Sequence, residues 1–364
     1  MTTVFVSAPR FIALVAFALP LVALSCDGDD TPPSFFDSGS DATSDAPPAS
    51  DASDAALPHA KIIAVHASPD LAAVRFCFGV GLQNDGSDAV VLAVAPTPSV
   101  APGGGAALPD LGVDLSQKAV TPYAVLTSAI TTLATCDALV AGDAGLASGT
   151  DFFALPTIKN GTLAGGTTIL AALTGCASSA VDPSGDITTC GSTYAASGNL
   201  AVKTFSLDRV VANSSRFGAQ IAHVSTPATG VWTALYTEST VNAVLHPLDG
   251  GADEVIAQGV TEGSLQPSSA ASLAAPSVDQ TSVIVSAVNP DGGATSAELA
   301  IPMPLVYEAT TGATTGENAY FDAGANYTFV FVGDPRQPTT LDGGAFNGYA
   351  LHLLAFPNDP TLPP

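Results

Sequence analysis

The sequence predicts an all-β protein in which two tandem immunoglobulin-like β-sandwich domains follow a disordered acidic tether. Three observations favour this class: short strand-like segments, a composition that disfavours helices, and a weak internal duplication. The chain of 364 residues contains 34 glycines and 28 prolines but only 2 methionines. With abundant Val, Thr, Ser and Ala, such a composition argues against a helical bundle. The length suggests about two domains.

Short β-rich segments separated by Gly, Pro, Asn and Asp begin after residue 58. The segments expected to form strands are 61–65, 74–78, 89–95, 167–173, 231–236, 283–288 and 327–332. Asp-Gly-Gly sequences at 249–251, 291–293 and 342–344 predict tight turns in which glycine supplies positive φ. No convincing amphipathic helix stands out, so the regular alternation of strands and turns predicts a sandwich or barrel.

The duplication links three pairs of segments. Residues 65–69 (VHASP) return as 222–227 (AHVSTP), with the two histidines 157 residues apart. Two further pairs recur in the same order, at offsets of 159 and 150 residues; they begin at Ala164 with Ala323, and at Gly198 with Gly348. Three matches in one order indicate a repeat of about 150 residues, long enough for its own core.

The boundary between the two copies is expected in a short polar stretch, Asn213 to Gly218. This choice gives one β-sandwich domain over residues 59–212 and a second over residues 213–364.

The N-terminus has the pattern of a secretory signal peptide over residues 1–25. Arg10 precedes an apolar run from Phe11 to Leu24, and Ser25 precedes Cys26. The run is shorter than the ~20 residues that a spanning helix needs. Residues 22–26 (VALSC) resemble a bacterial lipobox, in which the cysteine becomes the lipidated first residue. The alternative is cleavage by an ordinary signal peptidase, which would leave Cys26 as a free thiol.

Residues 26–58 form the predicted tether. Between Asp27 and Pro58 there are eight Asp and no Lys or Arg, mixed with Ser, Ala, Thr, Gly and Pro. Such a segment cannot bury enough apolar surface to offset the entropy of ordering, and its like charges keep it extended. We expect disorder, whether the segment is a stalk above a membrane or only a spacer.

The charge balance excludes nucleic acid as a partner. Lys+Arg number 9 against 33 Asp+Glu, a formal net charge of -24. A phosphate backbone would be repelled by this surface, and no basic stripe interrupts it.

The cysteines predict two disulfides. Five cysteines less a lipidated Cys26 leave an even number in an oxidising compartment. Three pairings are possible, and we expect Cys77 to bond Cys136 and Cys176 to bond Cys190. Alternation along residues 74–78 places Cys77 on the same face as Arg75, so this bond is expected to face solvent, outside the core.

No constellation for catalysis or for a bound metal is found, and no cofactor is expected. The histidines have none of the spacings of a zinc site; they are His59, His66, His223, His246 and His352. A calcium ion at an Asp-Gly-Gly turn is the alternative to a plain turn.

His66 and Asp70, four residues apart, would suit a catalytic base with its orienting carboxylate. A structural role is the preferred interpretation: the histidine bonds nearby backbone and Ser-Pro-Asp shapes a turn. Trp232 and Tyr236 are expected in the core or on a sheet face.

Residues 63–70 (IAVHASPD) and 74–78 (VRFCF) resemble the opening of a bacterial secreted family catalogued as domain of unknown function 4397. The stretch from Gly324 to Gly333 also resembles that family, whereas Arg75 departs from its usual acidic residue and the second copy lacks the Asp. The resemblance implies extracytoplasmic β-sandwich modules, often in tandem, without catalytic residues to carry over. The motif residues, with a structural role, are His66, Ser68, Pro69, Asp70 and His223.

These features predict a non-catalytic lipoprotein of the cell envelope that displays two β-sandwich modules for binding or structural support. Its partners would be the membrane, through Cys26, and a glycan or an envelope protein. The expected location is the outer membrane or cell surface of a Gram-negative bacterium. The alternative is an envelope hydrolase or carbohydrate-active enzyme, because 25 acidic residues beyond the tether could supply paired carboxylates.

Overall fold

A computed structural model describes the following residues: 59–131, 134–141, 144–178, 190, 194–225, 240–288, 298–313, 320–333 and 350–359. The signal peptide, Cys26 and the tether lie outside these residues, as do Trp232, Tyr236 and the turns at 291–293 and 342–344. Ala56–Pro364 form one compact unit. Among the described helices, none is long and apolar enough to cross a membrane.

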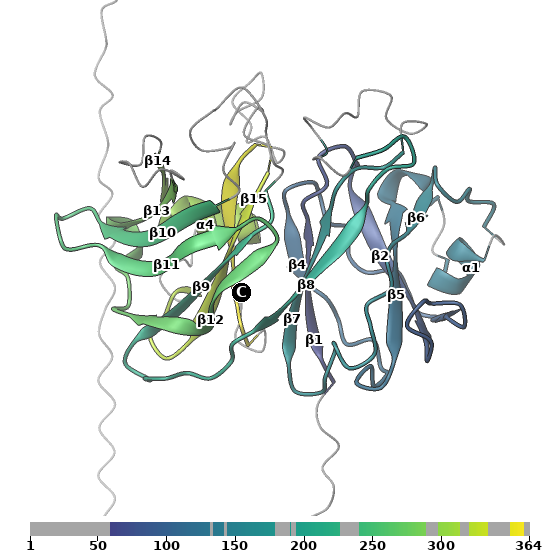
Figure 1. The fold of residues 1–364 in the computed structure, drawn as a ribbon, viewed down its shortest axis with the longest axis horizontal. Helices are drawn as coiled ribbons and strands as arrows, with labels where there is room; N and C mark the ends of the chain where they lie inside the picture. The colour runs from purple at the N-terminus through teal and green to yellow at the C-terminus, as the bar shows by residue number, and fades with distance from the viewer. Residues whose placement is uncertain are drawn as a thin grey trace, which may run out of the picture. The chain divides into compact units, whose positions relative to one another are not determined.

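The first eight strands form two sheets (Figure 1). They are β1 (Lys61–His66), β2 (Val74–Gly81), β3 (Val90–Val91), β4 (Gly105–Ala107), β5 (Ala119–Leu126), β6 (Phe152–Ala154), β7 (Thr168–Thr174) and β8 (Ala201–Leu207). Sheet A has the order β4-β1-β7-β8 and sheet B the order β3-β2-β5-β6. The strand expected over 89–95 is shorter in the structure, at Val90–Val91.

The next eight strands form two more sheets. They are β9 (Phe217–His223), β10 (Thr240–Pro247), β11 (Glu254–Thr261), β12 (Ser264–Leu273), β13 (Thr281–Ala287), β14 (Glu298–Pro302), β15 (Asn326–Val332) and β16 (His352–Pro357). Sheet C has the order β12-β9-β15-β16 and sheet D the order β11-β10-β13-β14. The prediction of an all-β protein made of sandwiches is therefore confirmed.

The two halves share one topology, strand for strand. Adding eight to each strand number of sheets A and B gives the strand orders of sheets C and D. The central pair is parallel in both halves, β1 with β7 and β9 with β15, whereas the other pairs in these sheets are antiparallel. We call β1–β8 the first copy and β9–β16 the second copy.

The strand register refines the offsets of the duplication. His66 lies opposite Leu173, and His223 lies opposite Phe331, so the first strands differ by 157 residues and the parallel partners by 158. The last strands differ by 151 residues, because Ser206 faces Ile169 where Pro357 faces Tyr327. The sequence-based offsets of 159 and 150 were each wrong by one residue, since similar apolar residues in adjacent positions hide the register.

Two glycines, Gly175 and Gly333, support this alignment of the first copy with the second independently of strand pairing, because they also lie 158 residues apart. Gly175 ends β7 with a φ of 75°, and Gly333 ends β15 with a φ of 104°. A Cβ on Gly175 would overlap the carbonyl oxygen of Asn199, and one on Gly333 would overlap that of Ala350. Each position thus requires glycine for both its backbone angle and its close approach to the chain entering the last strand.

Helices occur where the sequence predicted none. The described residues include α1 (Cys136–Val140), α4 (Met303–Thr311) and the 3-10 turns η1 (Thr127–Ala129) and η2 (Val278–Gln280). Helix α4 begins after Pro302 and ends at Gly312, which has a left-handed φ of 71°. Its buried side chains, Met303, Val306 and Tyr307, follow helical spacing. Proline before the helix and glycine after it were the available sequence signals.

Three apolar layers separate the four sheets. Ile62 and Ala64 of β1 belong to the layer that also contains Phe76 and Phe78 of β2, between sheets A and B. An equivalent layer lies between sheets C and D. Sheets A and C also face each other across a third layer, which we call the seam.

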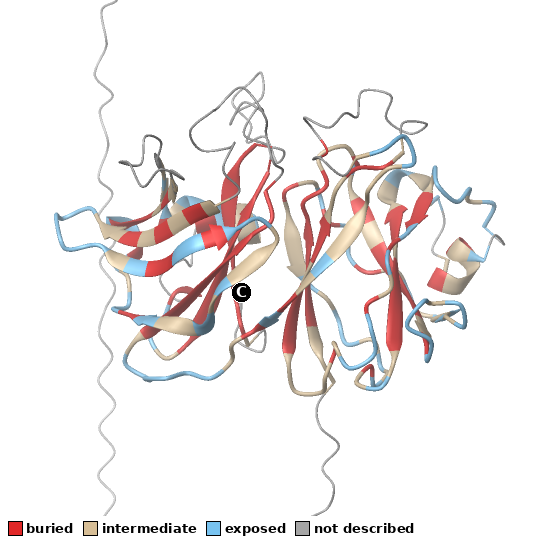
Figure 2. Cartoon of the chain, viewed as in Figure 1, coloured by how far each residue is buried: buried red, intermediate tan, exposed pale blue. Residues whose placement is uncertain are grey.

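The seam draws side chains from both copies. Its buried members are Ile63, Val65, Ala67, Leu170, Ala172, Phe205 and Leu207 of the first copy, and Ala222, Val224, Val330, Val332, Leu354 and Phe356 of the second. The central strands of sheets A and C are therefore covered on both faces, and every residue of β9, β15 and β16 is buried (Figure 2).

Gly105 shows how closely the copies approach. A Cβ added there would lie 2.6 Å from Cζ of Phe356 and 3.0 Å from the carbonyl oxygen of Ala64. The carbonyl belongs to the ladder of β1, so relief would have to come from the ring of Phe356 across the seam. Glycine at this position lets the ring of Phe356 pack directly on β4.

We predict that Gly105→Val destabilises the folded chain by about 1–3 kcal/mol, because the new side chain would displace the ring of Phe356 and crowd the carbonyl oxygen of Ala64. Ala107→Val is the matched control, because Ala107 is exposed two residues further along the same strand and should change stability by less than ~0.5 kcal/mol. Urea denaturation of both variants measures the difference. Equal stability of Gly105→Val and the unmodified protein would show that the seam is not closely packed.

Candidate functional site

His66 lies at the end of β1 and is fully buried. Its Nε2 donates to the carbonyl oxygen of Ala72, 3.0 Å away, while Nδ1 has no hydrogen-bond partner in the structure. Burial lowers the pKa of His66 to about 4, so the ring is neutral near pH 7.

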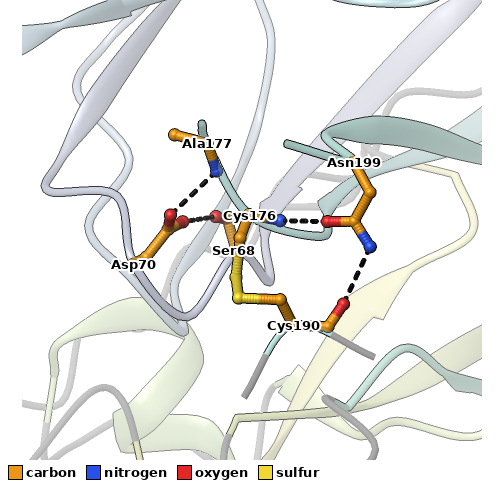
Figure 3. The surroundings of a disulfide bond; sticks show 6 residues. All are labelled: Ser68, Asp70, Cys176, Ala177, Cys190 and Asn199. Atoms are coloured by element: carbon orange, nitrogen blue, oxygen red, sulfur yellow. Dashed lines mark hydrogen bonds between the residues drawn. A yellow bond between two sulfur atoms is a disulfide. The ribbon is translucent and has the colours of Figure 1, made fainter. Parts of the chain in front are cut away.

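The carboxylate of Asp70 accepts hydrogen bonds from Ser68 and from the backbone, as Figure 3 shows. One carboxylate oxygen accepts from Ser68 Oγ at 2.8 Å, and the other accepts from the backbone N–H of Ala177 at 2.8 Å. The motif around Ser68, Pro69 and Asp70 therefore fastens the end of β1 to the chain leaving β7. These contacts favour a structural role over a His66–Asp70 catalytic pair.

The Cys176–Cys190 disulfide lies next to the hydrogen bonds of Asp70 (Figure 3). Its sulfur atoms are 2.02 Å apart, with a sequence separation of 14. The side chain of Asn199 hydrogen-bonds the backbone of both cysteines. Its Oδ1 accepts from the N–H of Cys176, and its Nδ2 donates to the carbonyl oxygen of Cys190, both at 2.8 Å. The connection from β7 to β8 is thus held by one covalent bond and several hydrogen bonds.

The Cys77–Cys136 disulfide has the expected partners but a different environment. Alternation in β2 does place Cys77 on the face opposite Phe76, away from the main core. The prediction that this face meets solvent was wrong: Cys77 and Cys136 are both fully buried. Helix α1 covers the outer face of sheet B there, and the disulfide packs in a small cluster with Val125, Leu139 and Phe152.

His223 occupies the equivalent place in the second copy. It is buried at the end of β9, with its ring centroid 5.3 Å from that of Phe331. Its Nδ1 lies 3.2 Å from Ser225 Oγ. Burial lowers its pKa to about 4, as for His66. The repeat thus preserves a neutral interior histidine, whereas Pro227 lies outside the described residues.

The other histidines are dispersed. His59 contacts Asp110 at 2.8 Å and His246 contacts Asp253 at 2.7 Å, both at the surface. His352 is buried in β16, and its Nε2 lies 2.8 Å from the carbonyl oxygen of Gly103 in the first copy. Among the residues described, no group of three or more His, Cys, Asp or Glu could hold a metal ion.

The Asp-Gly-Gly turn that falls within the described residues is held by its own side chain. Asp249 Oδ1 accepts from the N–H of Gly251 at 3.1 Å, and Gly250 has a φ of 85°. This is the local hydrogen bonding of a turn, the simpler of the two interpretations for this sequence.

A buried polar network, absent from the sequence-based expectations, lies beside the apolar seam. Asp208, just after β8, gives its N–H to Gln220 Oε1 at 2.9 Å. Its carbonyl oxygen accepts from the Nδ2 atoms of Asn326 and Asn358, at 3.0 and 2.7 Å. Thr328 completes the network by donating to Asn358 Oδ1 at 2.7 Å. Asn358 Nδ2 also donates to Gln220 Oε1 at 2.8 Å. Because the buried amides have these partners, the network adds specificity to the link between copies.

Asp359 adds an ionic link at the same place. It accepts from Lys61 Nζ at 2.8 Å and from Arg209 at 2.9 Å. The start of β1, the linker between β8 and β9 (residues 208–216) and the end of β16 therefore share one carboxylate. Apolar packing, amides and this ion bridge together fix the two copies against each other.

A groove of about 480 Å³ opens where the edge of sheet A approaches α4. One wall is the edge strand β4, with Ile63 of the adjacent strand. The other wall consists of the second half of α4 with Ala313, Tyr320, and the end of β16; its lining residues are Tyr307, Thr310, Thr311, Ala313, Tyr320, Phe356 and Pro357. The volume is within the range of ligand-binding pockets.

The hydroxyl groups of Thr310, Thr311 and Tyr320 in this lining are already engaged. Thr310 Oγ1 donates to Val306 O and accepts from the N–H of Ala355. Thr311 Oγ1 donates to Tyr307 O, and Tyr320 donates to Ala355 O. The ring of Tyr307 packs edge-on against that of Tyr320, with centroids 5.1 Å apart. The groove therefore offers a ligand apolar surface and backbone rather than free side-chain polar groups.

No family model and no curated protein matches this chain. Similar solved structures include a candidate cell adhesion protein from Bacteroides uniformis, with a TM-score of 0.21 and 10% identity over 82% of this chain and 97% of that chain. A candidate polysaccharide-binding protein from Bacteroides thetaiotaomicron has a TM-score of 0.21 and 9% identity, covering 80% and 97%. These scores are far below those of proteins that share a fold, and the resemblance to domain of unknown function 4397 stays a prediction.

Acid should destabilise the chain through its buried histidines. The pKa values of His66 and His223 are about 4 in the folded chain and 6.5 for an unperturbed histidine, as in the unfolded chain. Between pH 4 and pH 6.5 the unfolded chain therefore binds more protons than the folded one. Stability is full above pH ~6.5 and falls as the pH drops towards ~4. We expect a loss of about 2 kcal/mol per histidine between pH 7 and 5.

Urea denaturation across this pH range measures the effect. The slope of the unfolding free energy against pH is the quantity to compare. His66→Asn and His223→Asn should each remove about half of its histidine-dependent part, and the double variant should remove most of it. A slope that is unchanged in the double variant would contradict the assignment. His352, whose pKa burial also lowers, accounts for the remainder.

Proposed function

We propose that this chain is a lipid-anchored cell-envelope protein whose two sandwiches are displayed as one rigid body for binding. The observation that carries the proposal is the groove between β4 and α4. The hydroxyls of Thr310, Thr311 and Tyr320 in its lining are already hydrogen-bonded within the protein, and such a surface suits recognition better than chemistry. The apolar seam holds both walls of the groove in place.

The disulfides support an extracytoplasmic location. Both pairs have ordinary geometry, with Cα–Cα distances of 5.4 Å. Disulfides of this kind persist in oxidising compartments. The signal-like N-terminus and Cys26 add the membrane anchor, and the Asp-rich tether adds distance from the membrane. We place the protein at the outer membrane or surface of a Gram-negative bacterium.

The enzymatic alternative requires two facing carboxylates, one with a raised pKa. Burial raises the pKa of Glu262, in the turn between β11 and β12, whereas the charge of Lys203 opposes this shift. A carboxylate beside an ammonium group is not the acid pair of a glycosidase, so this observation favours the binding protein.

Cys26→Ser tests the anchor in the organism's own cells. The unmodified protein should incorporate labelled palmitate and fractionate with membranes, and protease added to intact cells should degrade it. Cys26→Ser should lose the label and appear in the soluble fraction. The matched control is the double variant Cys77→Ala with Cys136→Ala, which should keep the label because those thiols are paired and buried.

Membrane association of Cys26→Ser equal to that of the unmodified protein would contradict lipid anchoring. Complete protection from protease until the outer membrane is broken would contradict surface display.

A further inference from the structure

The edge strand β4 directs backbone groups into the groove. The N–H of Leu108 donates a hydrogen bond to the carbonyl oxygen of Ile62, and the N–H of His66 donates one to the carbonyl oxygen of Gly104. In an antiparallel ladder such bonded pairs alternate with pairs whose N–H and C=O point the other way. Gly105 and Ala107 therefore direct their backbone groups away from β1, towards the groove that they line.

The edge of β16, across the groove, differs from that of β4 because its outward backbone groups have hydrogen-bond partners. The outward N–H and C=O of Ala355 in β16 are bonded by Thr310 and Tyr320. The fold thus covers one of two facing sheet edges with a helix, and among the described strands none pairs with the outer side of β4. An uncovered edge is a template for another strand.

We propose that the groove binds an extended, apolar segment of a partner protein as an added strand beside β4. The inference rests on the proposed function and names the class of ligand. A glycan would need many side-chain hydrogen bonds, whereas the hydroxyls here are engaged. A polypeptide strand brings its own N–H and C=O groups to Gly105 and Ala107, and its alternate side chains contact the apolar wall.

Dimensions and charge define the segment further. The three residues of β4 span about 10 Å, which suits a strand of roughly four to five residues. The chain carries a formal net charge of -24, so residues flanking the bound segment should be neutral or basic rather than acidic.

The probe is an array of capped heptapeptides of pattern Lys-x-Ala-x-Ala-x-Lys, in which x is Val, Ile, Thr, Tyr or Phe. The mature chain should bind a subset, and the best binder is then titrated against variants. Ala107→Pro removes an N–H that points into the groove and should weaken binding about tenfold. Because that N–H lies outside the β1 ladder, the melting temperature should stay close to that of the unmodified protein.

Val91→Pro is the matched control. In β3, Leu92 bonds Phe78 and Val91 lies opposite Gly79, so the N–H of Val91 also points away from its partner strand, at an edge far from the groove lining. This variant should bind the peptide as the unmodified chain does. Amide hydrogen exchange should show protection of Gly105 and Ala107 when the peptide binds, and no change at Val91.

The inference is overturned if no peptide binds, if both proline variants weaken binding equally, or if Gly105 and Ala107 stay unprotected. Binding of a glycan that Ala107→Pro abolishes would also overturn it in favour of a sugar site. These results leave the proposed envelope location intact, because the Cys26→Ser experiment tests that independently.

Discussion

The structure depends on one constraint: the central strands of sheets A and C, β1 with β7 and β9 with β15, have almost no surface that can meet water. Each sheet packs on its own sandwich partner and also on the other across the seam. Apolar burial contributes roughly 25 cal/mol per Å², so exposing the seam would remove support from the central strands of both copies. The duplicated unit is therefore a half of a four-sheet body, and the groove exists because two copies meet.

The same constraint explains which residues are required at the junction. Gly105 has to be small because Phe356 packs over it. Gln220 and Asn358, both fully buried, hold Asp208 in place where apolar packing ends. An amide without a partner there would cost about 1–3 kcal/mol, so the network specifies a single arrangement of the linker.

Much of the fold could be read from the sequence, because its signals are local. Strands β1, β2, β7, β13 and β15 follow from apolar runs bounded by turn residues, and Cys176 with Cys190 bracket a short excursion. Alternation also gave the correct face for Cys77, but it does not reveal that α1 covers that face. The seam was missed, although the apolar run Phe329–Val332 in β15 is typical of a strand buried on both sides. The groove was not predictable, since Ile63, Tyr307 and Phe356 meet only through tertiary packing.

Scanning calorimetry of the mature chain tests most directly whether the two copies form one body. If the seam couples them, unfolding should be a single transition whose calorimetric and van't Hoff enthalpies agree. Two separate transitions, each with the heat expected of one sandwich, would contradict this and show that the copies are independent domains.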